Sequence, residues 1–166
     1  HVDAGRLDDL VAALVQPNGD PIGVTMAEFA SAPAGLVHAG RQEDIDALFD
    51  APDVASLRER LAGSSADWAQ KAVGALDQRS PLALSITLAA IREARSSGSL
   101  AQALNLEYRL TTRLFACGEF IEGIRALLVD KDKSPSWTPP TLEAVTPEMV
   151  AEFLTPLPPG EELDLS

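Results

Sequence analysis

The sequence contains little cysteine, few aromatic residues and few basic side chains. Cys117 is the single cysteine among 166 residues, so an internal disulfide is excluded and a reducing, cytoplasmic location is expected. Thirteen Lys and Arg stand against 25 Asp and Glu, a formal charge of −12 that disfavours nucleic acid and membrane surfaces as partners. No apolar run approaches the roughly 20 residues of a membrane-spanning helix. No cluster of Cys and His offers ligands for a metal ion.

The residue patterns of common catalytic sites are also missing. No Gly-x-Ser-x-Gly elbow or glycine-rich phosphate loop occurs. The two histidines, His1 at the terminus and His38 in an expected loop, are poorly placed to activate a Ser or Cys nucleophile. Cys117, at the end of an apolar helix, is interpreted as a small buried hydrophobe. Glu107 is interpreted as one half of a structural ion pair.

The apolar residues that are present are mostly Ala and Leu, which predicts an all-α chain. Apolar spacing predicts four helices in the first half: Leu7–Leu14, Ile45–Phe49, Val54–Leu61 and Trp68–Leu76. Gly63 is predicted to follow the third of these helices as its C′ residue, and Ser64 to cap the fourth. Residues 22–40 are expected to form a helical turn followed by a loop.

The second half carries clear helix boundaries. Ser80 before a proline predicts the start of a helix whose apolar residues, Leu88 among them, surround most of its circumference, as in a core helix. A capping box at Ser99–Gln102 opens a long helix to about Ala116. Gly118 is predicted to close that helix.

A further amphipathic helix is predicted from about Glu119 to Val129, and it leads into a loop with Lys131, Lys133 and Trp137. Cationic and aromatic side chains at the end of a helix suit an anionic ligand with an aromatic head.

Beyond Lys133 the chain changes in composition. Seven of the twelve prolines lie from Pro135 onward, and no Lys or Arg follows. Thr146-Pro147-Glu148 predicts the start of a short helix. The remainder is expected to form a strap along a surface.

Five motifs follow one another in the second half of the chain: Ser80-Pro81, Glu107–Leu110, Phe120–Asp132, Pro135–Trp137 and Thr146–Glu148. In order and spacing they resemble the C-terminal half of the 3-hydroxyisobutyryl-CoA hydrolase branch of the crotonase (enoyl-CoA hydratase/isomerase) superfamily. The Phe-x-Glu-Gly part is shared with enoyl-CoA hydratases, whereas Asp-Lys-Asp and Pro-x-Trp favour the hydrolase branch. Residues 45–61 resemble the inserted helices of that branch, and the opening His1-Val2-Asp3 resembles the sequence just after the crotonase core.

The resemblance implies that the all-α chain is the C-terminal helical part of an α/β crotonase fold whose β-rich core is absent. It divides the chain into four parts: a helix after the core (1–21), inserted helices (22–79), C-terminal crotonase helices (80–133) and a proline-rich strap with one short helix (134–166). Because the chain does not begin with Met, we expect it to be a fragment of a larger protein.

The implied activity is hydrolysis of a CoA thioester in valine degradation, with no cofactor other than the coenzyme A of the substrate. The catalytic Glu and the two oxyanion-binding N–H groups of the family belong to the core, so no catalytic residue is assigned to this chain and the chain alone is expected to be inactive. The resemblance places Lys131 and Lys133 where the family holds CoA, whereas Arg125, Glu122 and Asp130 are expected to form a structural ion-pair set.

The expected partners are an acyl-CoA substrate, the missing N-terminal core and, as a homo-oligomer, further copies of the chain. Two alternatives stay open. One is an enoyl-CoA hydratase or isomerase of fatty-acid oxidation, which the long insert before Ser80 disfavours. The other is a helical docking module without an active site, in which the same motifs serve packing alone.

Overall fold

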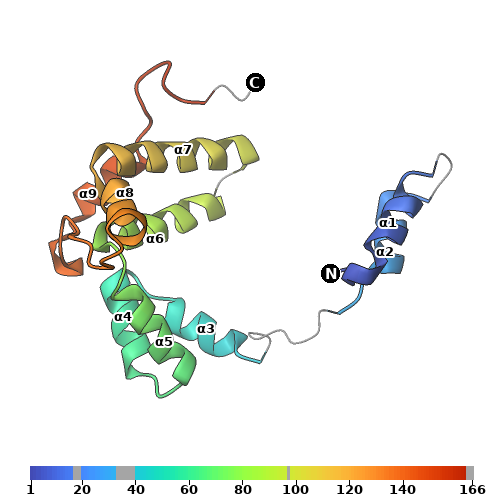
Figure 1. The fold of residues 1–166 in the computed structure, drawn as a ribbon, viewed down its shortest axis with the longest axis horizontal. Helices are drawn as coiled ribbons and strands as arrows, with labels where there is room; N and C mark the ends of the chain where they lie inside the picture. The colour runs from blue at the N-terminus through green and yellow to red at the C-terminus, as the bar shows by residue number, and fades with distance from the viewer. Residues whose placement is uncertain (17–19, 33–39, 97, 164–166) are drawn as a thin grey trace. The chain divides into compact units, whose positions relative to one another are not determined.

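The computed structural model describes residues 1–16, 20–32, 40–96 and 98–163, so His38 and most of the expected loop before Gly40 lie outside the described residues. Two compact units are present, His1–Ile45 and Asp46–Ser166. The boundary between them falls inside the segment of inserted helices inferred from the sequence. Figure 1 shows that the described elements are helices.

The first unit is built on a pair of helices, α1 (Leu7–Leu14) and α2 (Ile22–Phe29), preceded by a single turn, η1 (Ala4–Arg6). α2 is a full helix of eight residues where the sequence predicted a helical turn. An isolated antiparallel bridge joins Val2 to Ala30, and the guanidinium of Arg6 lies 4.5 Å from the ring centre of Phe29. His1 is exposed, and its ring contacts the Ser31 hydroxyl at 3.3 Å.

α3 (Gln42–Phe49) crosses the boundary between the units and leads into the hairpin of α4 (Val54–Gly63) and α5 (Asp67–Leu76). Leu61 and Ala69 are fully buried between α4 and α5, which explains why these two short helices stay paired. The carboxylate of Asp53 caps α4 by accepting a 2.7 Å hydrogen bond from the Ser56 N–H.

Two boundary predictions in this hairpin were wrong. Gly63 is the last residue of α4 and not its C′ residue, and the N-cap of α5 is Ala66 and not Ser64. The reason is a side chain from the neighbouring helix: Gln70 donates hydrogen bonds to the carbonyls of Ala62 (3.1 Å) and Ser64 (2.7 Å). The end of α4 is therefore satisfied without a left-handed glycine.

The main hydrophobic core lies among α6 (Pro81–Ser96), α7 (Leu100–Ala116) and α9 (Pro147–Leu154). Its buried members are Leu82, Ile86, Ala90, Leu106, Leu110 and Phe153.

The predicted caps are confirmed: the hydroxyls of Ser80, Ser99 and Thr146 accept hydrogen bonds from backbone N–H groups three residues later. Among the described residues, no helix is long and apolar enough to cross a membrane.

Burial along α6 is narrower than its sequence predicts. Leu82, Ile86 and Ala90 form one buried stripe, whereas Leu88 is only partly buried and Ile91 is 52% exposed. The interpretation of Cys117 as buried is wrong, because this C-cap residue of α7 is exposed. Gly118 does close α7, with a left-handed φ of 88°.

The predicted helix after Gly118 is divided in two: an α-helix, α8 (Glu119–Ile124), and a π-helical turn, η2 (Arg125–Val129). The Asp130 N–H donates to the Arg125 carbonyl at 2.8 Å, the five-residue spacing of a π turn. The chain then continues through a short turn, η3 (Leu142–Ala144), to α9.

Replacing Ile86 by Ala should lower the free energy of unfolding by about 2–5 kcal/mol, because this fully buried side chain leaves a cavity between the core helices. Ile91→Ala is the matched control, since the same truncation on the exposed side of α6 should cost less than about 1 kcal/mol. Urea unfolding followed by circular dichroism measures both. Equal losses would contradict the assignment of the core.

Candidate functional site

The predicted ion-pair set forms around the guanidinium of Arg125. Its Nε and Nη2 atoms each lie 2.8 Å from one oxygen of Glu122, a bidentate pair. Its Nη1 atom contacts Asp130 at 2.6 Å and Asp132 at 2.7 Å. Nη2 also donates to the Ser134 carbonyl at 3.1 Å. Asp132 is therefore a member that the sequence interpretation had not included.

These contacts shift the ionisation of the groups. The hydrogen bonds from Arg125 and from the Ser136 N–H lower the pKa of Glu122 from its ordinary value of 4.5 to about 2. The same guanidinium lowers the pKa of Asp132, and the carboxylates raise the pKa of Arg125. All three groups are charged at neutral pH, so the cluster is an ionic one.

The strap is fixed to α8 by two glutamates. Glu122 accepts a 2.6 Å hydrogen bond from the Ser136 N–H, and Glu119 accepts a 2.8 Å hydrogen bond from the Thr138 N–H. Between these contacts the Trp137 ring lies against Gly123, where an added Cβ would come within 3.3 Å of the indole. The role of Glu119 was missed in the sequence, although its place one residue before Phe-x-Glu-Gly is visible there.

Lys131 and Lys133 lie in the turn that follows η2. Both side chains are exposed, and both residues have a left-handed backbone, with φ of 57° and 54°. The Lys133 N–H donates to the Ala126 carbonyl at 3.0 Å, and Asp132 Oδ1 accepts from the Ser134 N–H at 2.8 Å. Within the part of the chain that the structure describes, neither ammonium group forms an ion pair. The turn thus presents two lysines that have no ion-pair partner among the described residues.

An uncovered apolar face adjoins this turn. Its members extend from the end of α7 through η2 and are between 38% and 68% exposed: Phe115, Phe120, Ile121, Ile124, Leu127, Leu128 and Val129. The opposite side of α8 and η2 is packed, with Glu119 and Ala126 buried. A contiguous exposed apolar face of this kind is typical of a surface that another part of a protein covers.

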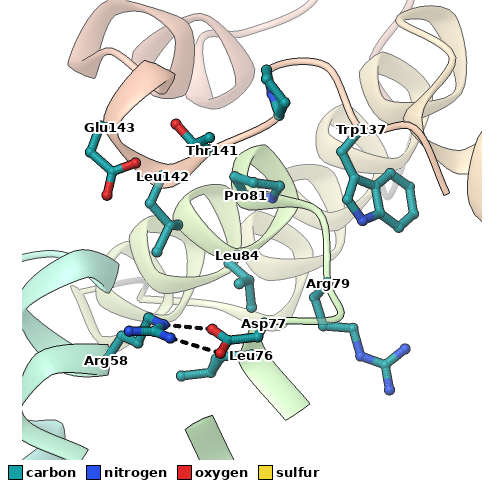
Figure 2. A pocket seen from close by; sticks show the side chains of 11 residues that line it. Arg58, Leu76, Asp77, Arg79, Pro81, Leu84, Trp137, Thr141, Leu142 and Glu143 are labelled. Atoms are coloured by element: carbon teal, nitrogen blue, oxygen red, sulfur yellow. Dashed lines mark hydrogen bonds and ion pairs between the residues drawn. The ribbon is translucent and has the colours of Figure 1, made fainter. Parts of the chain in front are cut away.

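A cavity of about 250 Å³ lies between the α4–α5 hairpin, the start of α6 and the strap. Figure 2 shows its polar wall, where Arg58 binds Asp77 through two hydrogen bonds of 2.5 and 2.7 Å, with Glu143 and Trp137 further along the lining. The bond from Arg58 lowers the pKa of Asp77. Since the Arg58 guanidinium is already bound to a carboxylate, we interpret this wall as a junction between helices.

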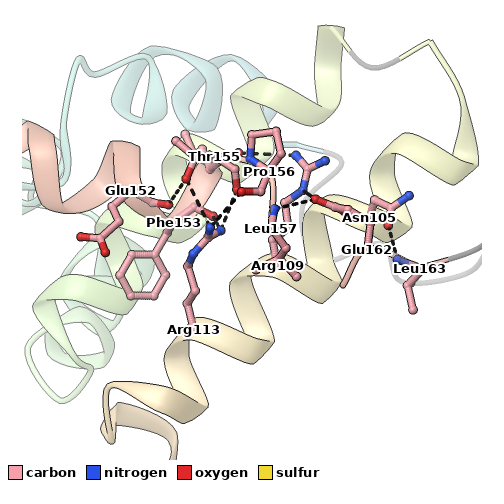
Figure 3. Close-up of polar contacts among 11 residues, drawn as sticks. Asn105, Arg109, Arg113, Glu152, Phe153, Thr155, Pro156, Leu157, Glu162 and Leu163 are labelled. Atoms are coloured by element: carbon pink, nitrogen blue, oxygen red, sulfur yellow. Dashed lines mark hydrogen bonds and ion pairs between the residues drawn. The ribbon is translucent and has the colours of Figure 1, made fainter. Parts of the chain in front are cut away.

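The C-terminal strap is bound to α7 by a row of polar side chains (Figure 3). Arg113 donates to the carbonyls of Phe153 (3.0 Å) and Thr155 (2.7 Å), and Arg109 pairs with Glu162 at 2.7 Å. Asn105 accepts from the Leu163 N–H at 2.9 Å. These residues were not assigned a role from the sequence.

The ion-pair interpretation of Glu107 was wrong. Glu107 is exposed and forms no ion pair with any described residue, and Arg109, which lies two residues along α7 and so does not face it, pairs with Glu162 on the strap. That contact lowers the pKa of Glu162.

Comparison with known proteins decides which family these helices belong to. A sequence model of the family described as enoyl-CoA hydratase/isomerase matches residues 1–154. The chain belongs to the enoyl-CoA hydratase/isomerase family. The predicted resemblance to the crotonase superfamily is thereby confirmed.

Similar proteins carry several names. The chain is 32% identical over 121 residues to mitochondrial 3-hydroxyisobutyryl-CoA hydrolase of Dictyostelium discoideum, covering 72% of this chain and 32% of that protein. It is 41% identical over 114 residues to small ribosomal subunit protein mS47 of Arabidopsis thaliana, covering 67% of this chain and 27% of that protein.

Among solved structures, an enoyl-CoA hydratase from Rhodobacter sphaeroides matches with a TM-score of 0.79 at 37% identity, over 98% of this chain and 46% of that one. The chain therefore spans less than half the length of these relatives. The expected all-α fold is confirmed, and the match agrees with a helical C-terminal part of a crotonase fold.

The ionic cluster of this enoyl-CoA hydratase/isomerase family member predicts acid sensitivity. The folded-state pKa of Glu122 is about 2, below its ordinary value of 4.5, so its contribution to stability is present above about pH 4.5 and is lost as the pH falls towards 2. Glu122→Gln should therefore unfold at a lower temperature at neutral pH, and the difference from the wild type should shrink on acidification.

Thermal unfolding at several pH values measures this effect. Glu107→Gln is the control, because Glu107 is exposed and forms no ion pair among the described residues. If the wild type and Glu122→Gln lost stability in parallel, the ionic cluster would not be the cause.

Proposed function

We propose that the chain is the C-terminal helical part of a CoA-thioester hydrolase that converts 3-hydroxyisobutyryl-CoA to 3-hydroxyisobutyrate and CoA in valine degradation. The observation that carries this proposal is the combination of an uncovered apolar face with an adjoining cationic turn, Lys131 and Lys133, in a chain of this family. The similarity to proteins named 3-hydroxyisobutyryl-CoA hydrolase supports the choice of substrate.

In this proposal the apolar face of α8 and η2 packs on a β-rich crotonase core. Burial of side chains such as Phe120, Leu127 and Leu128 supplies the driving force for this packing, since each is at least half exposed in the chain alone. The helices then cover the acyl pocket and exclude water from it. The proposal assigns proton transfer and stabilisation of the thioester oxyanion to the core.

The two lysines contact the phosphates of the CoA part. Their ammonium groups are exposed and form no ion pair with a described residue, so they are available to an anion. Coenzyme A enters as part of the substrate, and the reaction needs no other cofactor.

Two alternatives have observations in their favour. The similarity to an enoyl-CoA hydratase structure favours a hydratase or isomerase. The similarity to small ribosomal subunit protein mS47 favours a module that uses the same helices for docking without catalysis.

The activity is tested by mixing the chain with 3-hydroxyisobutyryl-CoA, alone and joined to a crotonase core, and by measuring release of the CoA thiol. The chain alone should show no turnover, and the joined protein should release thiol. If the joined protein is given an enoyl-CoA instead, hydration of that substrate without thiol release would favour the hydratase alternative. No reaction with 3-hydroxyisobutyryl-CoA or with the enoyl-CoA would favour the docking module. Turnover by the chain alone would contradict our assignment of catalysis to the core.

The CoA contact has its own test in the joined protein. Lys131→Glu should weaken CoA binding, because a carboxylate would face the phosphates, whereas Lys71→Glu, the same change on the exposed side of α5, should not. Isothermal titration calorimetry at fixed salt concentration measures both dissociation constants. An unchanged constant for Lys131→Glu would remove this contact from the proposal.

A further inference from the structure

The cationic turn has an unusual charge order for a site that holds an anion. The four residues Asp130 to Lys133 alternate acid and base, so an anion that approaches the lysines also approaches two carboxylates. At such short distances the repulsion by Asp130 and Asp132 would offset the attraction by Lys131 and Lys133. Anion binding is therefore favoured if another group binds the two carboxylates and reduces their repulsion.

Arg125 is that group. Its Nη1 atom lies 2.6 Å from Asp130 and 2.7 Å from Asp132, so one guanidinium nitrogen holds both carboxylates. The rest of the guanidinium is held by Glu122 through two bonds of 2.8 Å. The planar fork of an arginine is suited to several acceptors at once, and a lysine could not contact all of them in the same way.

The same side chain restrains the backbone of the turn. Lys131 and Lys133 both have a left-handed φ, which residues with a Cβ rarely adopt without support from their surroundings. Support comes from the Lys133 N–H bond to the Ala126 carbonyl at 3.0 Å and from the Arg125 bond to the Ser134 carbonyl at 3.1 Å. Arg125 thus acts on both the charge and the shape of the turn.

We infer that Arg125 is a positioning residue that binds Asp130 and Asp132, reduces their repulsion of an anion and holds the turn, so that Lys131 and Lys133 can bind the phosphates of coenzyme A. This inference rests on the CoA contact of the proposed function. It adds a residue that does not touch CoA but on which the contact depends, and it explains why acidic and basic residues alternate here.

The test uses the chain joined to a crotonase core, as for the CoA contact above, and coenzyme A as the probe, with the amide signals of Lys131 and Lys133 followed by NMR. Arg125→Met should weaken CoA binding by about tenfold, because two carboxylates are left facing the phosphates. Arg58→Met is the matched control, since it removes another bidentate arginine–carboxylate pair of the same unit and should leave CoA binding unchanged.

A rescue separates positioning from simple structural support. Adding Asp130→Asn and Asp132→Asn to Arg125→Met removes the repulsion without returning the arginine, and the amide oxygen introduced by Asp132→Asn would still accept from the Ser134 N–H. CoA binding should recover to within about threefold of the wild type. If Arg125→Met does not fold, Arg125→Lys is compared instead, with a smaller loss expected and the same recovery.

The outcomes test the inference about Arg125 separately from the proposed CoA contact on which it rests. If coenzyme A shifts the Lys131 and Lys133 signals equally in the wild type and in Arg125→Met, the inference is wrong and the CoA contact stands. A loss that the two Asn substitutions do not recover also overturns the inference, because Arg125 is then only structural. If the wild type shows no CoA response at either lysine, both the contact and the inference are overturned.

Discussion

The packing of Phe153 against α6 and α7 is the contact on which the C-terminal unit depends. Its ring is buried in the main core, and its carbonyl accepts a 3.0 Å hydrogen bond from Arg113 of α7. One residue therefore attaches α9 to the helix pair through both its side chain and its backbone. Because α9 follows the proline-rich segment directly, this attachment also limits where the strap can run, and the strap in turn places Trp137 against Gly123.

Arginines organise much of the polar structure of this acidic chain. Arg58 binds Asp77, Arg109 binds Glu162, and Arg125 binds three carboxylates. Such pairs, largely at the surface, add little stability singly, but a guanidinium that bridges several acceptors also restricts the backbone between them. With a net charge of −12 the chain offers few cationic positions to a ligand, so Lys131 and Lys133 gain importance from the absence of ion-pair partners among the described residues.

The apolar face of α8 and η2 connects the fold with the family. The chain spans less than half of a similar enoyl-CoA hydratase structure, yet its helices match that structure over almost their whole length. Packing within the unit buries only one side of α8 and η2. The other side has the composition of a protein interior although it is exposed, so it is suited to packing against another part of a protein.

The sequence by itself determined most of the helices, their caps at Ser80, Ser99 and Thr146, and the family, because these depend on local hydrogen bonds and on motifs in fixed order. Tertiary structure decided the rest. Gln70 replaced the predicted cap at the end of α4, Arg109 turned to the strap, and Cys117 stayed exposed. Each of these outcomes depends on which residue, distant in sequence, lies within hydrogen-bond reach or covers a helix face. The spacing of residues along the chain does not show which distant residues come together in space.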